Sequence, residues 1–224
     1  VTPGTITAHG NVAVATEYLG QGPEGIDSLL DTPTNYAADS GNNAGNYATL
    51  NPLSKGSNAT LSNGNLDLSC GSSSPRLAFS TIGMTSGKYY CEYTFDSGSA
   101  TNGLSGPSLT QTGYVGSAAD QWGYYHSNGQ LYNNNSGSSY GASYSTGDII
   151  GIAFDADNGT LTFYKNGTSQ GTAATGLTSG PYFFAFGEVN YNGSVNFGQR
   201  PFAYTPPTGY VSLCTENLSE SAYA

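Results

Sequence analysis

The fold class of this chain is decided by residues 147–167, GDIIGIAFDADNGTLTFYKNG. Apolar side chains recur there at every second position: Ile150, Ile152, Phe154, then Leu161 and Phe163. This is the period of a β-strand with one buried face. Asp155–Gly159 has the composition of a hairpin loop, and Asn166-Gly167 is the pair that a type I′ turn selects, because both central residues need positive φ. The stretch therefore predicts antiparallel strands joined by tight turns.

Short segments of this kind, separated by turn residues such as Asn63-Gly64 and Asn128-Gly129, continue along most of the chain. The expected strands are 58–62, 65–70, 75–80, 88–96, 112–118, 121–126, 129–132, 148–155, 160–165, 168–173, 181–187, 193–197 and 209–213. Residues 98–112 are polar and rich in Gly and Ser, and they predict a long loop. No amphipathic helix is evident, and many short strands with regular turns are typical of a sandwich or barrel. We therefore expect an all-β chain.

Composition excludes several classes of partner. Charged residues make up 9% of the 224 residues, and the formal net charge is −10, whereas an average domain is about 25% charged. The five Lys and Arg residues are scattered singly, although phosphate recognition needs clustered cations. We therefore expect no nucleic acid partner and no binding to anionic membranes. No apolar run approaches the roughly 18 residues of a membrane span, so no membrane insertion is expected.

Three parts are expected along the chain: an extended N-terminal arm with one strand and a turn-rich connector (1–48), a β-sandwich (49–215) and a C-terminal tail (216–224). Ile6, Val12 and Val14 mark the strand of the arm. A lone strand must pair with another strand to be stable, so these residues are the candidates for assembly. The chain does not begin with Met, which suggests a processed or excised piece of a longer protein.

The chain has three cysteines, which form no disulfide framework. Cys70 falls on the same strand face as two leucines, and Cys91 falls on the same face as two tyrosines and a phenylalanine. Both therefore resemble buried thiols. A Cys70–Cys91 disulfide would require their strands to be neighbours. Reduced core thiols, in a protein folded in a cytosol, are the favoured interpretation.

Four segments in order resemble the SPRY domain family. They are GKYYCEY (87–93), QWGYY (121–125), SYG (139–141) with GDIIG (147–151), and NGTLTFYKNG (158–167). The resemblance covers residues 49–200, roughly two thirds of the chain. It implies an antiparallel two-sheet β-sandwich of the SPRY-like, concanavalin-like jelly-roll kind. It also implies binding of partners through loops at one end, and no enzymatic activity.

The flanking segments resemble those of phage virion and tail proteins that carry this domain. They are DTPTNY (31–36), NYATLNPL (46–53), VNFGQRPF (195–202) and TPPTGY (205–210). This resemblance implies a non-enzymatic phage virion structural protein, such as a tail fibre, an appendage or a capsid-surface component. Its expected location is the virion, and its expected partners are other virion subunits in a homo-oligomer.

A Tyr- and Asn-rich turn carries the candidate ligand surface: Tyr124, Tyr125, His126, Tyr132, Asn133 and Asn134. Aromatic faces and amides suit both sugars and protein partners, and strand alternation must turn either Tyr124 or Tyr125 outward. The expected ligand is a host surface glycan or protein. Cross-strand tyrosine ladders are the purely structural alternative.

Two other functions stay open. One is a pure assembly module that forms a homo-oligomer or filament by exchange of the N-terminal strand. The other is a glycan-depolymerising enzyme with paired acids such as Asp148 and Asp155, although turn chemistry already explains both residues. The Asp155–Gly159 loop departs from a calcium loop because Gly stands at its fifth position, and no Cys lies at metal-ligand spacing from His9 or His126. We expect no enzyme, no cofactor and no metal.

Overall fold

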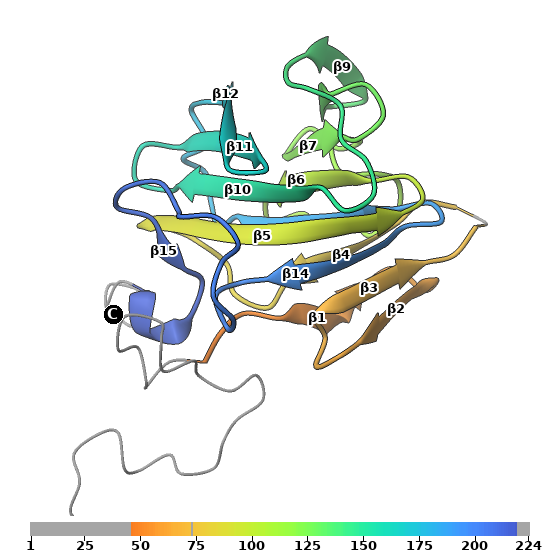
Figure 1. Ribbon diagram of the computed structural model, residues 1–224, viewed down its shortest axis with the longest axis horizontal. Helices are drawn as coiled ribbons and strands as arrows, with labels where there is room; N and C mark the ends of the chain where they lie inside the picture. Colours follow the sequence, from red (N-terminus) through yellow and green to blue (C-terminus); the bar gives the residue numbers. More distant parts are fainter. Residues whose placement is uncertain (1–45, 73, 219–224) are drawn as a thin grey trace, which may run out of the picture.

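The computed structural model describes residues 46–72 and 74–218. In that part of the chain the strands are β1 (Leu50–Lys55), β2 (Ala59–Ser62), β3 (Asp67–Cys70), β4 (Arg76–Ser80), β5 (Lys88–Ser97), β6 (Thr101–Ser105), β7 (Gln121–Tyr125), β8 (Gln130–Asn133), β9 (Ser136–Ser139), β10 (Ile149–Asp155), β11 (Thr160–Lys165), β12 (Thr168–Ala174), β13 (Phe183–Glu188), β14 (Asn192–Asn196) and β15 (Val211–Ser212). One short 3-10 helix, η3 (Thr215–Asn217), follows them (Figure 1). No helix among the described residues has the length and apolar character to span a membrane.

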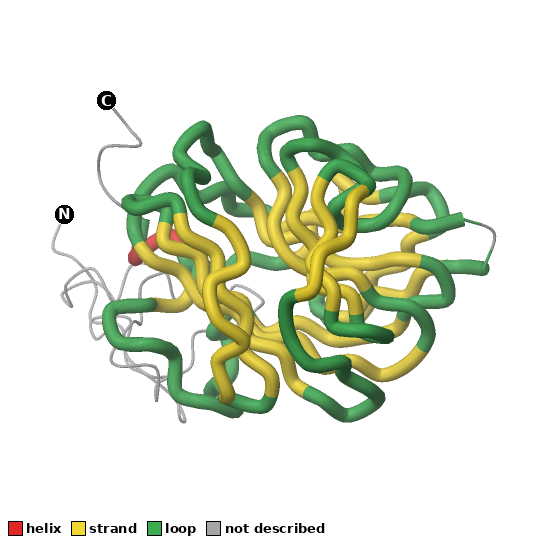
Figure 2. The backbone as a smooth tube through the Cα atoms, turned by 90° about the horizontal axis from the view of Figure 1, so that it is seen from above, coloured by secondary structure: helices red, strands yellow, loops and turns green. Residues whose placement is uncertain are grey.

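The strands form two sheets that pack face to face. The seven-stranded sheet has the order β1-β4-β13-β6-β7-β8-β9, and the eight-stranded sheet has the order β12-β11-β10-β5-β14-β3-β2, with β15 beside β5. The β15–β5 pair is parallel, and the neighbours along each sheet are antiparallel. Strands fill the centre of the molecule and loops surround them (Figure 2). The predicted antiparallel two-sheet β-sandwich is confirmed.

The hairpin that decided the fold class is formed as predicted. β10 pairs with β11 in an unbroken register from Ile150↔Lys165 to Asp155↔Thr160. Ile150, Ile152 and Phe154 are fully buried. Asn166 and Gly167 have φ values of 48° and 77°, as a type I′ turn requires.

The interior is aromatic and partly hydroxylated. Its largest fully buried side chains include five tyrosines: Tyr89, Tyr90, Tyr93, Tyr124 and Tyr191. The hydroxyl of Tyr144 donates to the carbonyl oxygen of Tyr124 at 2.9 Å, so at least part of this polarity is satisfied inside the core. Cys70 and Cys91 are buried, as the strand alternation predicted, and the two do not form a disulfide with each other.

The structure differs from the predicted strands in the region before β7. Residues 98–112, predicted as a loop, contain β6, all five residues of which are buried. The polar sequence of β6 does not indicate burial, but its polar groups form hydrogen bonds inside the sandwich. Asn102 Oδ1, for example, accepts the N–H of Gly187 at 2.8 Å. A Cβ atom at Gly103 would lie 2.1 Å from the carbonyl oxygen of Trp122, so only glycine fits there. β1 and β9 were also missing from the prediction.

Residues 112–118, predicted as a strand, belong instead to the loop 106–120 that joins β6 to β7. This loop lies on the outer face of the seven-stranded sheet. Val115 is buried there in a second small core, whose other buried members are Leu77, Phe79 and Ala185. The loop therefore adds a third layer over the centre of this sheet.

The segment after β14 covers the outer face of the other sheet. Glu92 on β5 is buried, and its carboxylate accepts the N–H groups of Ala203 at 2.8 Å and Tyr204 at 2.9 Å. Burial raises the pKa of Glu92, and these N–H donors act against that rise. The ring of Phe202 packs on Tyr90 with centroids 5.0 Å apart. The segment is therefore an integral part of the sandwich.

We expect Asp155→Asn to lower the free energy of unfolding by about 1–3 kcal/mol at pH 7, because hydrogen bonds to a charged group are lost. Asp155 accepts the backbone N–H of Asn158 at 3.0 Å and lies 3.0 Å from Lys88 Nζ. Burial raises the pKa of Asp155, but the donors of Asn158 and Lys88 outweigh it and hold the pKa below its usual value. Such a group stabilises the fold above its unfolded pKa of about 3.9, and this contribution is lost as the pH falls through the folded value.

Urea unfolding at several pH values between about 7 and 3 checks this expectation. The gap between wild type and Asp155→Asn should narrow toward the acid end. Glu216→Gln removes the same charge from an exposed residue and serves as the control. A gap of constant size across the pH range would contradict the prediction.

Candidate functional site

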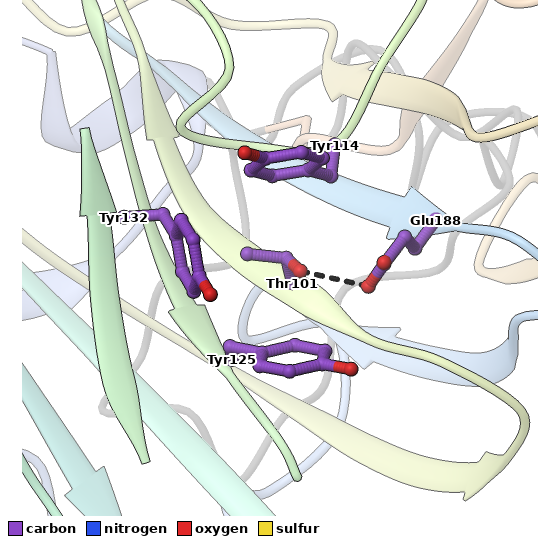
Figure 3. Close-up of a pocket in the computed structure, with 5 residues that line it drawn as sticks. All are labelled: Thr101, Tyr114, Tyr125, Tyr132 and Glu188. Atoms are coloured by element: carbon purple, nitrogen blue, oxygen red, sulfur yellow. Dashed lines mark hydrogen bonds between the residues drawn. The ribbon is translucent and has the colours of Figure 1, made fainter. Parts of the chain in front are cut away.

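A pocket of about 180 Å³ opens on the outer face of the seven-stranded sheet, beside the loop 106–120. Its lining residues come from four strands and that loop: Thr101 (β6), Tyr114 (loop), Tyr125 (β7), Tyr132 (β8) and Glu188 (β13). Figure 3 shows these side chains converging on one space. We call this site the three-tyrosine pocket.

Strand register explains why these side chains meet. Thr101 is paired with Tyr125, and Gly123 is paired with Tyr132. Directly opposed residues share a face of the sheet, as do residues two apart in one strand. Because Tyr124 points into the core, Tyr125 points outward, and Thr101 and Tyr132 point to the same side.

The three rings enclose the pocket from different sides. The rings of Tyr114 and Tyr132 have centroids 5.4 Å apart and planes at 83°. Tyr125 and Tyr132 have centroids 5.8 Å apart and planes at 88°. In Figure 3, Tyr114 and Tyr125 lie on opposite sides of the space, and Tyr132 forms the wall between them.

Hydrogen bonds hold two of these rings in place. The Tyr114 hydroxyl donates to Asn135 Oδ1 and the Tyr132 hydroxyl donates to Gln130 Oε1, each at 3.1 Å. Burial, with the nearby Tyr132 and Glu188, raises the pKa of Tyr114. The Tyr114 hydroxyl therefore stays protonated at neutral pH and presents an uncharged aromatic ring.

Glu188 places one carboxylate opposite the wall formed by Tyr132 (Figure 3). The hydroxyl of Thr101 donates to Glu188 Oε2 at 2.7 Å and fixes the orientation of the group. Arg76 is the register partner of Glu188, but its guanidinium donates to the carbonyl oxygen of Pro75 at 2.8 Å. The two ion pairs of the described residues are Lys88–Asp155 and Lys165–Asp148, so Glu188 belongs to neither.

The structure divides the residues of the predicted ligand surface. Tyr125 and Tyr132 line the three-tyrosine pocket. His126 lies next to it, with its ring centroid 5.1 Å from that of Tyr125. Burial lowers the pKa of His126 despite the opposing charge of Glu188, so the imidazole is neutral at pH 7.

The remaining predicted ligand residues have other roles or positions. Tyr124 is fully buried and its hydroxyl donates to the carbonyl oxygen of Ala142, so it cannot contact a ligand. The Asn133 amide donates to the carbonyl oxygens of Ala119 at 3.0 Å and Gln121 at 2.7 Å, which ties down the loop 106–120. Asn134 is exposed with a φ of 50° in the turn after β8. The assembly candidates Ile6, Val12 and Val14 lie outside the described residues.

Sequence reasoning missed Thr101, Tyr114 and Glu188. Thr101 lies in β6, which was predicted as a loop, and Tyr114 lies in the loop 106–120, part of which was predicted as a strand. Glu188 is the last residue of β13. The sheet order β13-β6-β7-β8 brings them together, and no local pattern reports that order. Tyr114 could have been proposed as a binding residue from its type alone, because it is a tyrosine in a polar, Gly-rich stretch.

A second hollow of about 270 Å³ lies on the eight-stranded sheet near Glu92, Asn196 and Arg200. Its polar side chains already form hydrogen bonds within the protein. Glu92 accepts the N–H groups of residues 203 and 204, and the Asn196 amide donates to the carbonyl oxygens of Arg200 and Pro201. Among residues 46–72 and 74–218, no group of three or more His, Cys, Asp or Glu residues is placed to hold a metal ion. The three-tyrosine pocket is therefore the stronger candidate site.

The SPRY domain family model matches residues 88–200, half of the chain, and the chain belongs to this family. The chain is 30% identical over 139 residues to the ATP-dependent RNA helicase DDX1 of Xenopus laevis. This alignment covers 60% of this chain and 18% of the helicase. The chain is 31% identical over 106 residues to Ran-binding protein 10 of Danio rerio, covering 46% of this chain and 17% of that protein. Ran-binding protein 9 of Mus musculus is 32% identical over 106 residues, covering 46% of this chain and 16% of that protein.

The chain thus spans less than a fifth of the length of these relatives. Among solved structures, the SPRY domain of human HERC1 matches with a TM-score of 0.59 at 20% identity. That match covers 68% of this chain and 99% of the HERC1 domain. It is a likeness of fold.

The relatives overturn the predicted phage origin. They are a helicase and Ran-binding proteins of frog, fish and mouse. The predictions of a phage virion protein and of a virion location are therefore wrong, and virion subunits or a host glycan as partners have no support. One segment behind the phage resemblance, 195–202, begins in β14, and its Asn196 amide donates to the carbonyl oxygens of Arg200 and Pro201.

The opposite placement of Tyr124 and Tyr125 can be tested by unfolding. Tyr124→Ala should lower the free energy of unfolding by about 3–5 kcal/mol, because it leaves a cavity among buried rings. Tyr125→Ala should lower it by less than about 1 kcal/mol, because this ring lines an open pocket. Guanidinium chloride unfolding measures both values. Equal losses in the two variants would contradict the assigned strand orientation.

Proposed function

We propose that this chain is a protein-interaction module that binds a segment of a partner protein in the three-tyrosine pocket and catalyses no reaction. Membership of the SPRY family supports the class of function, because SPRY domains mediate protein–protein interaction. Two of the relatives are named as Ran-binding proteins. We take from them the class, which is binding of a protein, and not their particular partner.

The observation that carries the proposal is the arrangement of Tyr114, Tyr125 and Tyr132 around one open space. Tyrosine offers a large contact surface at low conformational cost, since it has only two side-chain torsions. Interface residues that contribute most to affinity are enriched in Tyr, Trp and Arg and cluster in pockets. The pocket also holds a carboxylate, Glu188, that can fix the orientation of a polar ligand group.

Binding without catalysis agrees with the chemistry of the lining. The pocket holds one carboxylate, one hydroxyl that is already bonded to it, and three tyrosines. His126 is neutral and packs between aromatic rings, with Phe95 5.0 Å away. These groups are suited to recognition by shape, stacking and one charge.

A library of random peptides displayed on yeast tests the proposal when it is selected against residues 1–224. We expect selected peptides to lose about tenfold or more in affinity for Tyr132→Ala, which removes the wall of the pocket. Tyr164→Ala is the matched control, because Tyr164 is a half-buried tyrosine on the outer face of the other sheet, against Tyr90. Biolayer interferometry measures the affinities.

Two outcomes would overturn the proposed site. One is selection of peptides whose affinity is unchanged by Tyr132→Ala. The other is a larger loss for Tyr164→Ala than for Tyr132→Ala, which would place binding on the eight-stranded sheet.

A further inference from the structure

We propose that the three-tyrosine pocket selects an arginine side chain of the partner segment, with Glu188 as its counter-ion. This inference rests on the proposed function, because it names the ligand chemistry of the same pocket. It follows from two features of the site: the arrangement of the aromatic rings and the charge of one carboxylate.

The rings leave a slot for a flat group. Tyr114 and Tyr125 are each nearly perpendicular to Tyr132, at 83° and 88°, and lie on opposite sides of the space (Figure 3). A planar guanidinium that enters between Tyr114 and Tyr125 has an aromatic face on either side and Tyr132 at its end. The negative faces of aromatic rings attract cations, and arginine forms such contacts more often than lysine.

Glu188 supplies the charge that this cation requires. Its carboxylate is outside both ion pairs of the described residues. Thr101 fixes Oε2 with a 2.7 Å hydrogen bond, and no bond to Oε1 is seen within residues 46–72 and 74–218. A guanidinium presents parallel N–H donors that match the two oxygens of a carboxylate. Glu188 lies across the pocket from Tyr132, where the edge of a guanidinium in the slot would point (Figure 3).

The pocket favours arginine over lysine. An ammonium is strongly hydrated and directs three donors that need acceptors, whereas a guanidinium is weakly hydrated and flat. The hydroxyls of Tyr114 and Tyr132 are bonded to Asn135 and Gln130, so the rings offer mainly their faces. The acidic chain, with a formal net charge of −10, also attracts basic segments from solution.

Arginine and its neutral analogue provide a direct test. N-acetyl-arginine amide and N-acetyl-citrulline amide have nearly the same shape, but citrulline carries no charge. Titration of each into residues 1–224, followed by proton NMR of the tyrosine rings, measures both dissociation constants. We expect arginine to bind about tenfold more tightly than citrulline. Equal affinities would overturn the inference, and so would N-acetyl-lysine amide or its trimethyl form binding at least as tightly as arginine.

Matched variants assign the effect to the pocket. Glu188→Gln keeps an acceptor for Thr101 and should weaken arginine binding about tenfold, whereas Glu216→Gln, at an exposed position, should leave it unchanged. Tyr125→Phe should retain binding and Tyr125→Leu should weaken it severalfold, because only the phenyl ring keeps an aromatic face. Unchanged affinity in Glu188→Gln, or equal affinity in the two Tyr125 variants, would overturn the inference.

The peptide selection separates this inference from the proposed function. Peptides that depend on Tyr132 but contain no arginine, and that bind Glu188→Gln as well as wild type, would overturn the arginine assignment and leave the binding site in place. Arginine-containing peptides that do not depend on Tyr132 would overturn the proposed site itself.

Discussion

The candidate site depends on a close approach between two backbone segments at Gly123. A Cβ atom there would lie 2.0 Å from the carbonyl oxygen of Val115 and 2.6 Å from Cγ2 of Thr101. Glycine therefore allows the loop 106–120 to lie directly on β7. The loop is then held by burial of Val115 and by the Asn133 amide. Tyr114 is carried on this loop, so the position of the third ring follows from the contact at Gly123.

Local and long-range information contributed differently to what the sequence could predict. The β10–β11 hairpin follows from residues within one stretch, and its type I′ turn follows from Asn166-Gly167. The pocket joins β6, β7, β8, β13 and a loop, whose adjacency is set by sheet order. β6 could not be recognised because its burial is a property of its neighbours and not of its own polar residues. Of the six predicted ligand residues, Tyr125 and Tyr132 line the pocket. Period-two alternation is a local rule, and it predicted that either Tyr124 or Tyr125 faces outward, but not which of the two.

Each outer face of the sandwich is partly covered by chain that is not in a strand. On the eight-stranded sheet, Glu92 is buried under residues 203–204 and its oxygens are occupied by their N–H groups. On the seven-stranded sheet, Glu188 lines the pocket together with Tyr114 of the loop 106–120, and it keeps an oxygen for another donor. A buried carboxylate with internal donors stabilises a chain segment, whereas a carboxylate at the edge of an open aromatic pocket can bind a partner.

Fluorine NMR can show whether partners bind in the three-tyrosine pocket. The 18 tyrosines of the chain can be labelled with 3-fluorotyrosine, and the signals can be assigned through single Tyr→Phe variants. On addition of a selected peptide, we expect the signals of Tyr114, Tyr125 and Tyr132 to shift, while those of the buried Tyr89 and Tyr191 stay in place. Shifts confined to Tyr164 or Tyr204, near the eight-stranded sheet, would place binding on that sheet and contradict binding in the three-tyrosine pocket.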